Sequence, residues 1–202
     1  NISVADTTIC DGDVAGVFDA GAGFSSYAWS GNGTGTSQTT ARTTAGVYTV
    51  NVVDGNGCKD TTSASLFINS KPNISVADTT ICDGDVAGVF NAGAGFTTYN
   101  WSGNGTGSSQ ITARTTAGVY TVNVVDANGC KDTTSATLTI NAKPNISVAD
   151  TTICDGDVAG VFDVGAGFSS YAWSGNGTGT SQTTARTTAG VYTVRVVDAN
   201  GC

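Results

Sequence analysis

The clearest pattern in the chain is an alternation of apolar and polar positions in residues 47–53. Its even positions Tyr48, Val50 and Val52 are all apolar. A period of two places these side chains on one face of a β-strand. In residues 25–30, Tyr27 and Trp29 are also two positions apart and share a face. Both segments therefore predict strands with one side turned toward a core.

Similar short runs of strand-favouring residues alternate with turn residues along the first third of the chain. Val, Ile, Thr, Tyr and Phe favour strands, whereas Gly, Asp and Asn gather where the chain turns. In residues 14–20 we expect Val14, Val17 and Phe18 to be core contacts. The predicted strands are residues 1–9, 14–20, 25–30, 37–44, 47–53 and 62–69, with turns at 10–13, 21–23, 31–35 and 54–57. Six or seven short strands at this spacing predict a β-sandwich.

This set of strands is repeated, because the chain is a 72-residue unit in tandem. The ten residues that begin at Asn1 recur unchanged from Asn73 and from Asn145. A unit of this length suits a small folded domain better than one turn of a solenoid. We expect the last unit to lack the segment that matches residues 59–68, so that its final strand is missing or comes from another chain. The predicted sandwich modules are residues 1–72, 73–144 and 145–202.

Composition supports an all-β chain and narrows its function. Met and His are absent, every acidic residue is Asp, and Gly occurs 28 times, so strong helix formers are scarce. The net charge is −8 with 8 Lys and Arg, whereas nucleic-acid binding needs a basic face. No apolar run approaches the ~18 residues of a membrane span. No signal peptide is visible, and we expect a mature or internal fragment.

Six cysteines indicate the compartment. They alternate at spacings of 48 and 24 residues, two per repeat and without a CxxC pair. Zinc sites need clustered Cys or His, and His is absent. Disulfides in an oxidising, extracellular setting are therefore favoured over zinc and over buried free thiols. The cysteines are Cys10, Cys58, Cys82, Cys130, Cys154 and Cys202.

Three segments of each unit together resemble a known family. They are Cys10-Asp11-Gly12-Asp13, Tyr27-Ala28-Trp29-Ser30-Gly31, and Ala45-Gly46-Val47-Tyr48-Thr49-Val50 through Asp54-Gly55-Asn56-Gly57-Cys58. The pattern is similar to the Ig-like and PKD-like tandem repeats of giant cell-surface proteins in gliding and adhesive Bacteroidetes, with SprB-type repeat adhesins the nearest. The resemblance covers nearly all of each unit. It implies a secreted surface adhesin or filament with one sandwich per repeat, and it brings no catalytic residues.

Two disulfide pairings are open within this Ig-like resemblance. Pairing inside each repeat leaves no cysteine over: Cys10–Cys58, Cys82–Cys130 and Cys154–Cys202. In an Ig-like Greek key, however, the turns that hold Cys10 and Cys58 lie at opposite ends of the sandwich. A seven-residue strand is about 23 Å long, while a disulfide needs Cα atoms within about 7 Å. This favours pairing between neighbouring repeats, Cys10–Cys130 and Cys82–Cys202, with Cys58 and Cys154 paired to units outside this sequence.

Pairs of Asp in the first turn are the only candidate metal ligands. Asp-x-Asp in a turn offers carboxylate oxygens to Ca²⁺, although no complete EF-hand loop follows. The competing interpretation is a solvated turn in which Asp accepts backbone N–H groups, and it is favoured. Apart from Ca²⁺ no cofactor is expected. The candidate positions are Asp11, Asp13, Asp83, Asp85, Asp155 and Asp157.

Asp-Thr-Thr triplets form a second candidate set. They match the O-glycosylation motif that the resembled bacterial group uses on exported proteins, so the resemblance implies modification. The alternative is that they are plain Thr-rich strand ends. The modified positions would be Thr7, Thr61, Thr79, Thr133 and Thr151.

Two classes of function remain after these observations. With no His and no paired nucleophile and base, and with units too small for a cleft, we expect no enzyme. A structural stalk or filament would have further copies of the same repeat as partners, whereas a binding array would hold surface glycans or proteins with avidity. The location of the aromatic residues discriminates between them. Trp29, Trp101 and Trp173 at alternating strand positions favour a core, hence the structural role.

Overall fold

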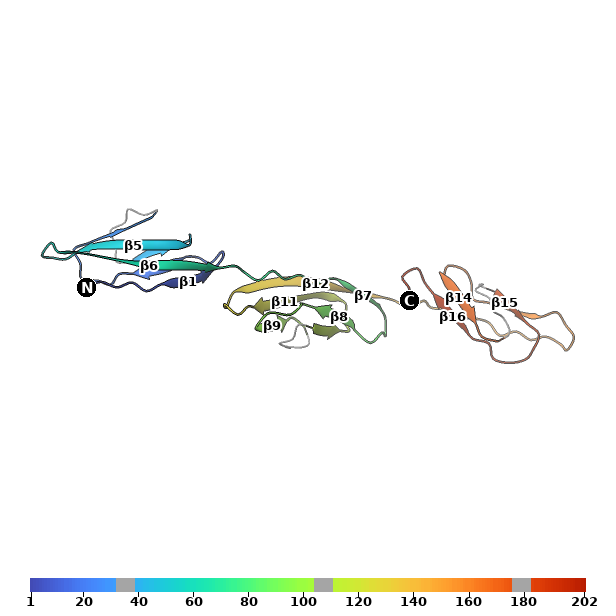
Figure 1. The fold of residues 1–202 in the computed structure, drawn as a ribbon. Helices are drawn as coiled ribbons and strands as arrows, with labels where there is room; N and C mark the ends of the chain where they lie inside the picture. The colour runs from blue at the N-terminus through green and yellow to red at the C-terminus, as the bar shows by residue number, and fades with distance from the viewer. Residues whose placement is uncertain (32–38, 104–110, 176–182) are drawn as a thin grey trace. The chain divides into compact units, whose positions relative to one another are not determined.

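The computed structural model describes residues 1–31, 39–103, 111–175 and 183–202 (Figure 1). Across these ranges it contains sixteen strands and no helix, so the predicted all-β class is confirmed. No helix in the described residues is long and apolar enough to cross a bilayer. Residues 32–38 of the predicted loop at 31–35 and strand at 37–44 lie outside the described part.

The first repeat forms two sheets. The larger has four strands in the order β1-β6-β5-β3, with β6 antiparallel to β5 and parallel to β1 (Figure 1). The smaller pairs β2 with β4 in antiparallel register. The strands are β1 (Thr7–Cys10), β2 (Gly16–Asp19), β3 (Ser26–Trp29), β4 (Thr39–Arg42), β5 (Gly46–Val53) and β6 (Lys59–Asn69).

A core of alternating side chains from both sheets holds this repeat together. Val50 and Val52 of β5 are 0% exposed, as the period-two pattern predicts. Tyr27 and Trp29 of β3 and Phe18 of β2 are buried in the same cluster. Two sheets that close over one core in this way make an Ig-like β-sandwich, and the predicted fold is confirmed.

Two details of the predicted strands are wrong. Val14 and Val17 were expected in the core, but they are 97% and 57% exposed. Val17 precedes the buried Phe18, so alternation turns it outward, and Val14 lies in the turn before β2. The first strand also begins at Thr7, six residues later than predicted, because only Thr7–Cys10 meet a partner, the last four residues of β6.

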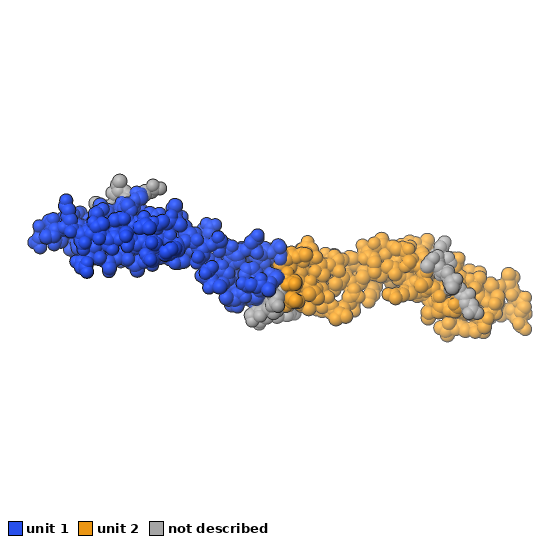
Figure 2. All heavy atoms as spheres, in the orientation of Figure 1, with its two compact units in different colours: residues 1–75, 92–110, 121–134 blue, residues 76–91, 111–120, 135–202 orange. Residues whose placement is uncertain are grey.

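The chain forms two compact units whose boundary runs through the second repeat (Figure 2). One comprises residues 1–75, 92–110 and 121–134, the other residues 76–91, 111–120 and 135–202. In the first unit β9 (Thr98–Trp101) pairs with β11 (Gly118–Val125). In the second, β7 (Thr79–Cys82) pairs with β12 (Lys131–Asn141), and β8 (Gly88–Asn91) pairs with β10 (Ile111–Arg114). The division into three modules at the repeat boundaries remains a prediction.

The third repeat keeps only part of this pattern. Within its described residues β13 (Gly160–Asp163) pairs with β15 (Thr183–Arg186), and β14 (Ser170–Trp173) pairs with β16 (Val194–Val197). Residues 151–154, which match β1, are not a strand. Residues 190–193, which match the first half of β5, are not a strand either.

Candidate functional site

Each compact unit contains one disulfide that joins two successive repeats. Cys10 is bonded to Cys130 in the first unit, with Cα atoms 5.6 Å apart. Cys82 is bonded to Cys202 in the second, with Cα atoms 5.5 Å apart. These are the pairs that the Ig-like geometry favours, and their presence is consistent with an oxidising compartment.

The length of β6 explains why Cys10 does not bond to the cysteine of its own repeat. Cys10 lies opposite Asn69, the last residue of β6, whereas Cys58 directly precedes Lys59, the first. The strand has 11 residues and so separates the two cysteines by roughly 33 Å. A disulfide needs Cα atoms within about 7 Å, so the intact sheet excludes the pair within the repeat.

Asp carboxylates orient the cysteines at both ends of the repeat. Asp13 accepts the backbone N–H of Cys10 at 2.9 Å, and Asp85 and Asp157 do the same for their cysteines. At the other end Asp54 accepts the N–H of Cys58 at 2.8 Å. In the same way Asp126 and Asp198 accept the N–H groups of Cys130 and Cys202. Sequence reasoning missed the second contact, although the Asp-x-Asn-Gly-Cys spacing signals it.

These contacts bear on the calcium prediction. Asp13, Asp85 and Asp157 act as the turn-capping acceptors of the alternative interpretation, while Asp11, Asp83 and Asp155 are exposed. The structure brings no three potential ligands together anywhere in its described residues. A calcium site therefore remains a prediction without a formed cage.

The candidate Thr residues occupy two environments. Thr7 and Thr79 donate their hydroxyls to the carbonyl oxygens of Val17 and Val89 at 3.2 and 3.1 Å. Thr61 and Thr133 donate to the side-chain oxygens of Asn51 and Asn123 across the outer face of the sheet, at 2.7 and 2.5 Å. Thr151 is exposed. O-glycosylation at these positions stays a prediction.

The three Trp residues are core residues, as the favoured interpretation has it. Trp29, Trp101 and Trp173 are 6%, 2% and 8% exposed. All aromatic residues of the chain fall in the described ranges, and Phe67 is the only large exposed one, at 54%. Its counterpart in the second repeat is Thr139, so no exposed aromatic recurs from repeat to repeat.

A stacked arginine also recurs that sequence reasoning did not find, and it is buried in the first two repeats and half-buried in the third. The guanidinium of Arg42 lies 5.0 Å from the ring centre of Tyr48 and donates to the Ser30 carbonyl at 2.8 Å. The same stacking recurs in the pairs Arg114–Tyr120 and Arg186–Tyr192. The constant spacing of Arg and Tyr is a signal for it, and the contact ties the two sheets together.

The two cysteines without a partner in this chain are both exposed. Cys58 occupies the position of Cys130 and Cys202 in its own repeat, and Cys154 occupies the position of Cys10 and Cys82. Each is therefore placed as the bonded cysteines are, and by the same pairing the partner of Cys58 would lie one repeat upstream and that of Cys154 one repeat downstream.

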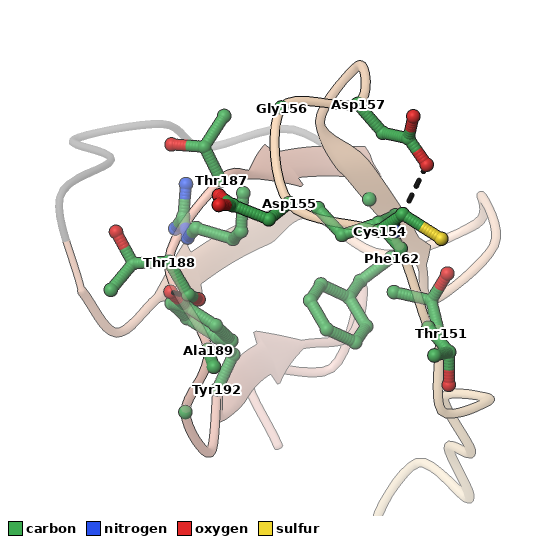
Figure 3. Close-up of a pocket in the computed structure, with 15 residues that line it drawn as sticks. Thr151, Cys154, Asp155, Gly156, Asp157, Phe162, Thr187, Thr188, Ala189 and Tyr192 are labelled. Atoms are coloured by element: carbon green, nitrogen blue, oxygen red, sulfur yellow. Dashed lines mark hydrogen bonds between the residues drawn. The ribbon is translucent and has the colours of Figure 1, made fainter.

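Beside Cys154 the third repeat has a cavity of about 560 Å³ (Figure 3). One wall is the segment 151–157, and the other is the segment 186–190 with Tyr192. Gly160 and Phe162 of β13 line it as well. Figure 3 shows Phe162 and Tyr192 turned toward this space.

No family model matches the chain, and neither does any curated protein. Among solved structures it is similar to Sidekick-1 immunoglobulin domains 1–5, at 16% identity and a TM-score of 0.37 over 86% of this chain and 46% of that one. It is also similar to the insect immune protein hemolin, at 16% identity and a TM-score of 0.35 over 70% of this chain and 46% of that one. The titin domains z1z2, solved in complex with telethonin, show 16% identity and a TM-score of 0.28 over 71% of this chain and 97% of that one.

At these identities and TM-scores the likenesses carry no argument, and the fold assignment rests on the strand order and core described above. The chain is an all-β array of Ig-like sandwich repeats in which disulfides join neighbouring repeats. This architecture is compatible with a structural or an adhesive role.

Proposed function

We propose that the chain is part of the stalk or filament of a bacterial cell-surface adhesin of the SprB-like kind, and that it is stapled along its length by disulfides between neighbouring repeats. The observation that carries the proposal is the disulfide from each repeat to the next. A bond of this kind adds nothing to a binding face inside one domain. It adds a second covalent link between neighbouring domains, which limits how far the chain can lengthen when it is stretched.

The alternative is a multivalent array that binds glycans or proteins. Such an array needs the same contact surface in every repeat, and aromatic side chains are its usual anchors. The buried Trp residues and the unrepeated Phe67 supply no such surface. A role without catalysis, at an extracellular site, follows from the same considerations and belongs to the proposal.

Stretching single molecules between their ends tests the structural role. When a stretched chain unfolds, each residue adds about 3.6 Å. The fully reduced chain should therefore extend to about 720 Å. With both disulfides intact, the shortest covalent route runs from residue 1 to Cys10, across to Cys130, back along the chain to Cys82 and across to Cys202, which gives about 210 Å.

The control variant is C58S with C154S, which removes the free thiols and keeps both disulfides. It should extend to the short length without reductant and to the long length with it. A long extension in the oxidised control would refute the stapled array. Binding of the oxidised chain to a panel of surface glycans, abolished by a change at Phe67, would favour the alternative.

A further inference from the structure

We propose that a pocket of the first repeat, formed around the buried guanidinium of Arg42, binds a small carboxylate ion. The inference goes beyond the proposed function, because it concerns a ligand held inside one repeat and does not depend on what the array as a whole does. The pocket has a volume of about 350 Å³. We call it the arginine pocket, and its lining residues are Gly31, Ala41, Arg42, Thr43, Thr44 and Tyr48.

The charge of Arg42 is buried and has no counter-ion from this chain. Only 9% of Arg42 is exposed. Every acidic side chain is an Asp, and all of them lie in the described residues, yet none forms an ion pair with Arg42. Residues 32–38, outside the described part, contain no acidic residue in their sequence. Because a buried charge without a partner is costly, an anion at this place removes a penalty that an exposed arginine does not carry.

The guanidinium also keeps unused hydrogen-bond donors. It carries five N–H bonds. Nη1 donates to the Ala41 carbonyl at 3.3 Å and Nη2 donates to the Ser30 carbonyl at 2.8 Å, which uses one N–H of each. The Nε–H is buried and has no acceptor among the described residues. A carboxylate accepts two N–H groups of one guanidinium side by side, so it is the anion whose shape suits the donors that remain.

Two threonine hydroxyls at the rim of the arginine pocket add neutral donors. Thr43 and Thr44 are exposed, and neither hydroxyl has a hydrogen-bond partner in the part of the chain that the structure describes. The Tyr48 hydroxyl is already used, since it donates to the Thr44 carbonyl at 2.6 Å. The Tyr48 ring stacks on the guanidinium and fixes its orientation. A cation held in place beside two free hydroxyls is a preorganised site for an anion.

The size and charge of the molecule limit the kind of anion. Ligand pockets commonly have about 300–1,000 Å³, so the arginine pocket lies at the small end of this range. The net charge of the chain is −8, which repels nucleic acids and other polyanions. A singly charged carboxylate matches the single guanidinium. The carboxylate can belong to a simple organic acid or to an acidic sugar, since both present the same group.

The third repeat provides an internal comparison. Its matching arginine, Arg186, lines the cavity beside Cys154 together with Asp155 and Asp157. Carboxylates that already face this cavity oppose the entry of an anion. By contrast, none of the described residues that line the arginine pocket is acidic. The first repeat should therefore bind the carboxylate more tightly than the third.

The probe is sodium acetate, titrated into the oxidised C58S/C154S chain at constant ionic strength with sodium chloride as the balancing salt. The Nε–H resonance of Arg42, identified by its loss in Arg42→Lys, should shift and saturate at about 1–10 mM acetate. Arg195 is the matched control, because it is exposed on β16 and its resonance should not move. Equal shifts at Arg42 and Arg195, or no saturable shift at Arg42, would overturn the proposal.

Two variants test the donors. Arg42→Lys keeps the charge but loses the planar pair of donors, and it should weaken acetate binding at least about tenfold, followed through the amide resonances of Thr43 and Thr44. Thr43→Val keeps the shape, removes one hydroxyl and should weaken binding about fivefold. If Arg42→Lys fails to fold, Thr43→Val decides, because its side chain is exposed. Unchanged affinity in Thr43→Val would refute the site.

Glucuronate, with glucose as its neutral counterpart, identifies the source of the carboxylate. A dissociation constant for glucuronate at least about tenfold below that of acetate would assign the site to an acidic sugar, because the sugar hydroxyls then bind as well. Equal constants would assign it to simple carboxylates. Glucose that binds as tightly as glucuronate would show that the charge is not recognised, which contradicts the proposal.

Discussion

The first and third repeats have nearly the same sequence and different structures. Over the 58 residues that they share, Ala20, Asn51 and Gly55 are replaced by Val164, Arg195 and Ala199, and nothing else differs. Yet the core of the first repeat has nine buried residues and that of the third has four. None of the three replacements explains a loss of this size. What separates the two repeats is β6, which has no counterpart in the described residues of the third.

The comparison shows which parts of a sandwich depend on a neighbouring strand. In β5 the residues Val50–Val53 pair with both β3 and β6, while Gly46–Thr49 pair with β6 alone. In the third repeat the residues that match Val50–Val53 form β16, whereas residues 190–193, which match Gly46–Thr49, are not a strand. The same amino acids therefore form a strand or not according to a partner far away in sequence.

The largest difference should appear when the same phenylalanine is removed from both copies. Phe18 is 1% exposed, whereas Phe162 is only partly buried. Phe18→Ala should lower the free energy of unfolding of its repeat by about 4 kcal/mol, and Phe162→Ala by about half of that, because less apolar surface is lost. Native-state hydrogen exchange in urea measures both. Equal losses would contradict the structural contrast.

Removing the key leucine of β6 should make the first repeat resemble the third. Leu66→Ala should cost its repeat about 3 kcal/mol through the cavity that it leaves. Leu138→Ala should do the same in the second repeat and serves as the replicate. Exchange in the third repeat, which is the internal control, should not respond to Leu66→Ala. A change there of similar size would mean that the leucine acts outside its own sandwich.

Hydrogen exchange of the unaltered protein should separate the two halves of the fifth strand. Residues 46–49 should exchange at least about a hundredfold more slowly than residues 190–193, a difference of about 2.7 kcal/mol in opening free energy. Peptides that cover residues 47–55 and their copies are distinguishable by mass, because they differ at Asn51 and Gly55. Equal protection in the two copies would contradict the loss of strand structure in the third.

The smallest effect concerns the carboxylate that holds the edge of β6. Asp6→Ala removes the acceptor of the Ser65 N–H and should cost about 1 kcal/mol in the first repeat. Asp150→Ala, the matched control, should cost the third repeat nothing, because no strand lies beside Asp150 in the part of this repeat that the structure describes. Urea unfolding of the two variants, followed repeat by repeat through exchange, measures the difference. A similar cost in both would show that the carboxylate acts within its own loop.

Much of the sandwich was predictable, because its strongest strands carry their own pattern. Tyr48, Val50 and Val52 alternate, and burial follows the alternation. The errors arose where neighbours in space, rather than the local sequence pattern, determine where a strand begins and which side chains are buried. The start of β1 is set by the end of β6, and Val17 differs from Phe18 only in the face to which it points.

The candidate site was less predictable from residues alone. The spacing of the cysteines does not distinguish pairing within a repeat from pairing between repeats, and only a sandwich geometry does. The cavity beside Cys154 has no motif, because its lining residues are the same as the matching residues of the first repeat. The contact of Asp54 with Cys58 was also hidden, since Asp in a turn has many uses.

The two disulfides overlap along the chain, since Cys82 lies inside the loop closed by Cys10 and Cys130. A single protease cut anywhere between Cys10 and Cys202 therefore leaves both pieces covalently joined. Cuts between Cys82 and Cys130 are spanned by both bonds. A chain cut between Cys82 and Cys130 thus stays joined after either one of its disulfides is reduced. After a cut in this segment, two reductions rather than one are needed before the pieces separate.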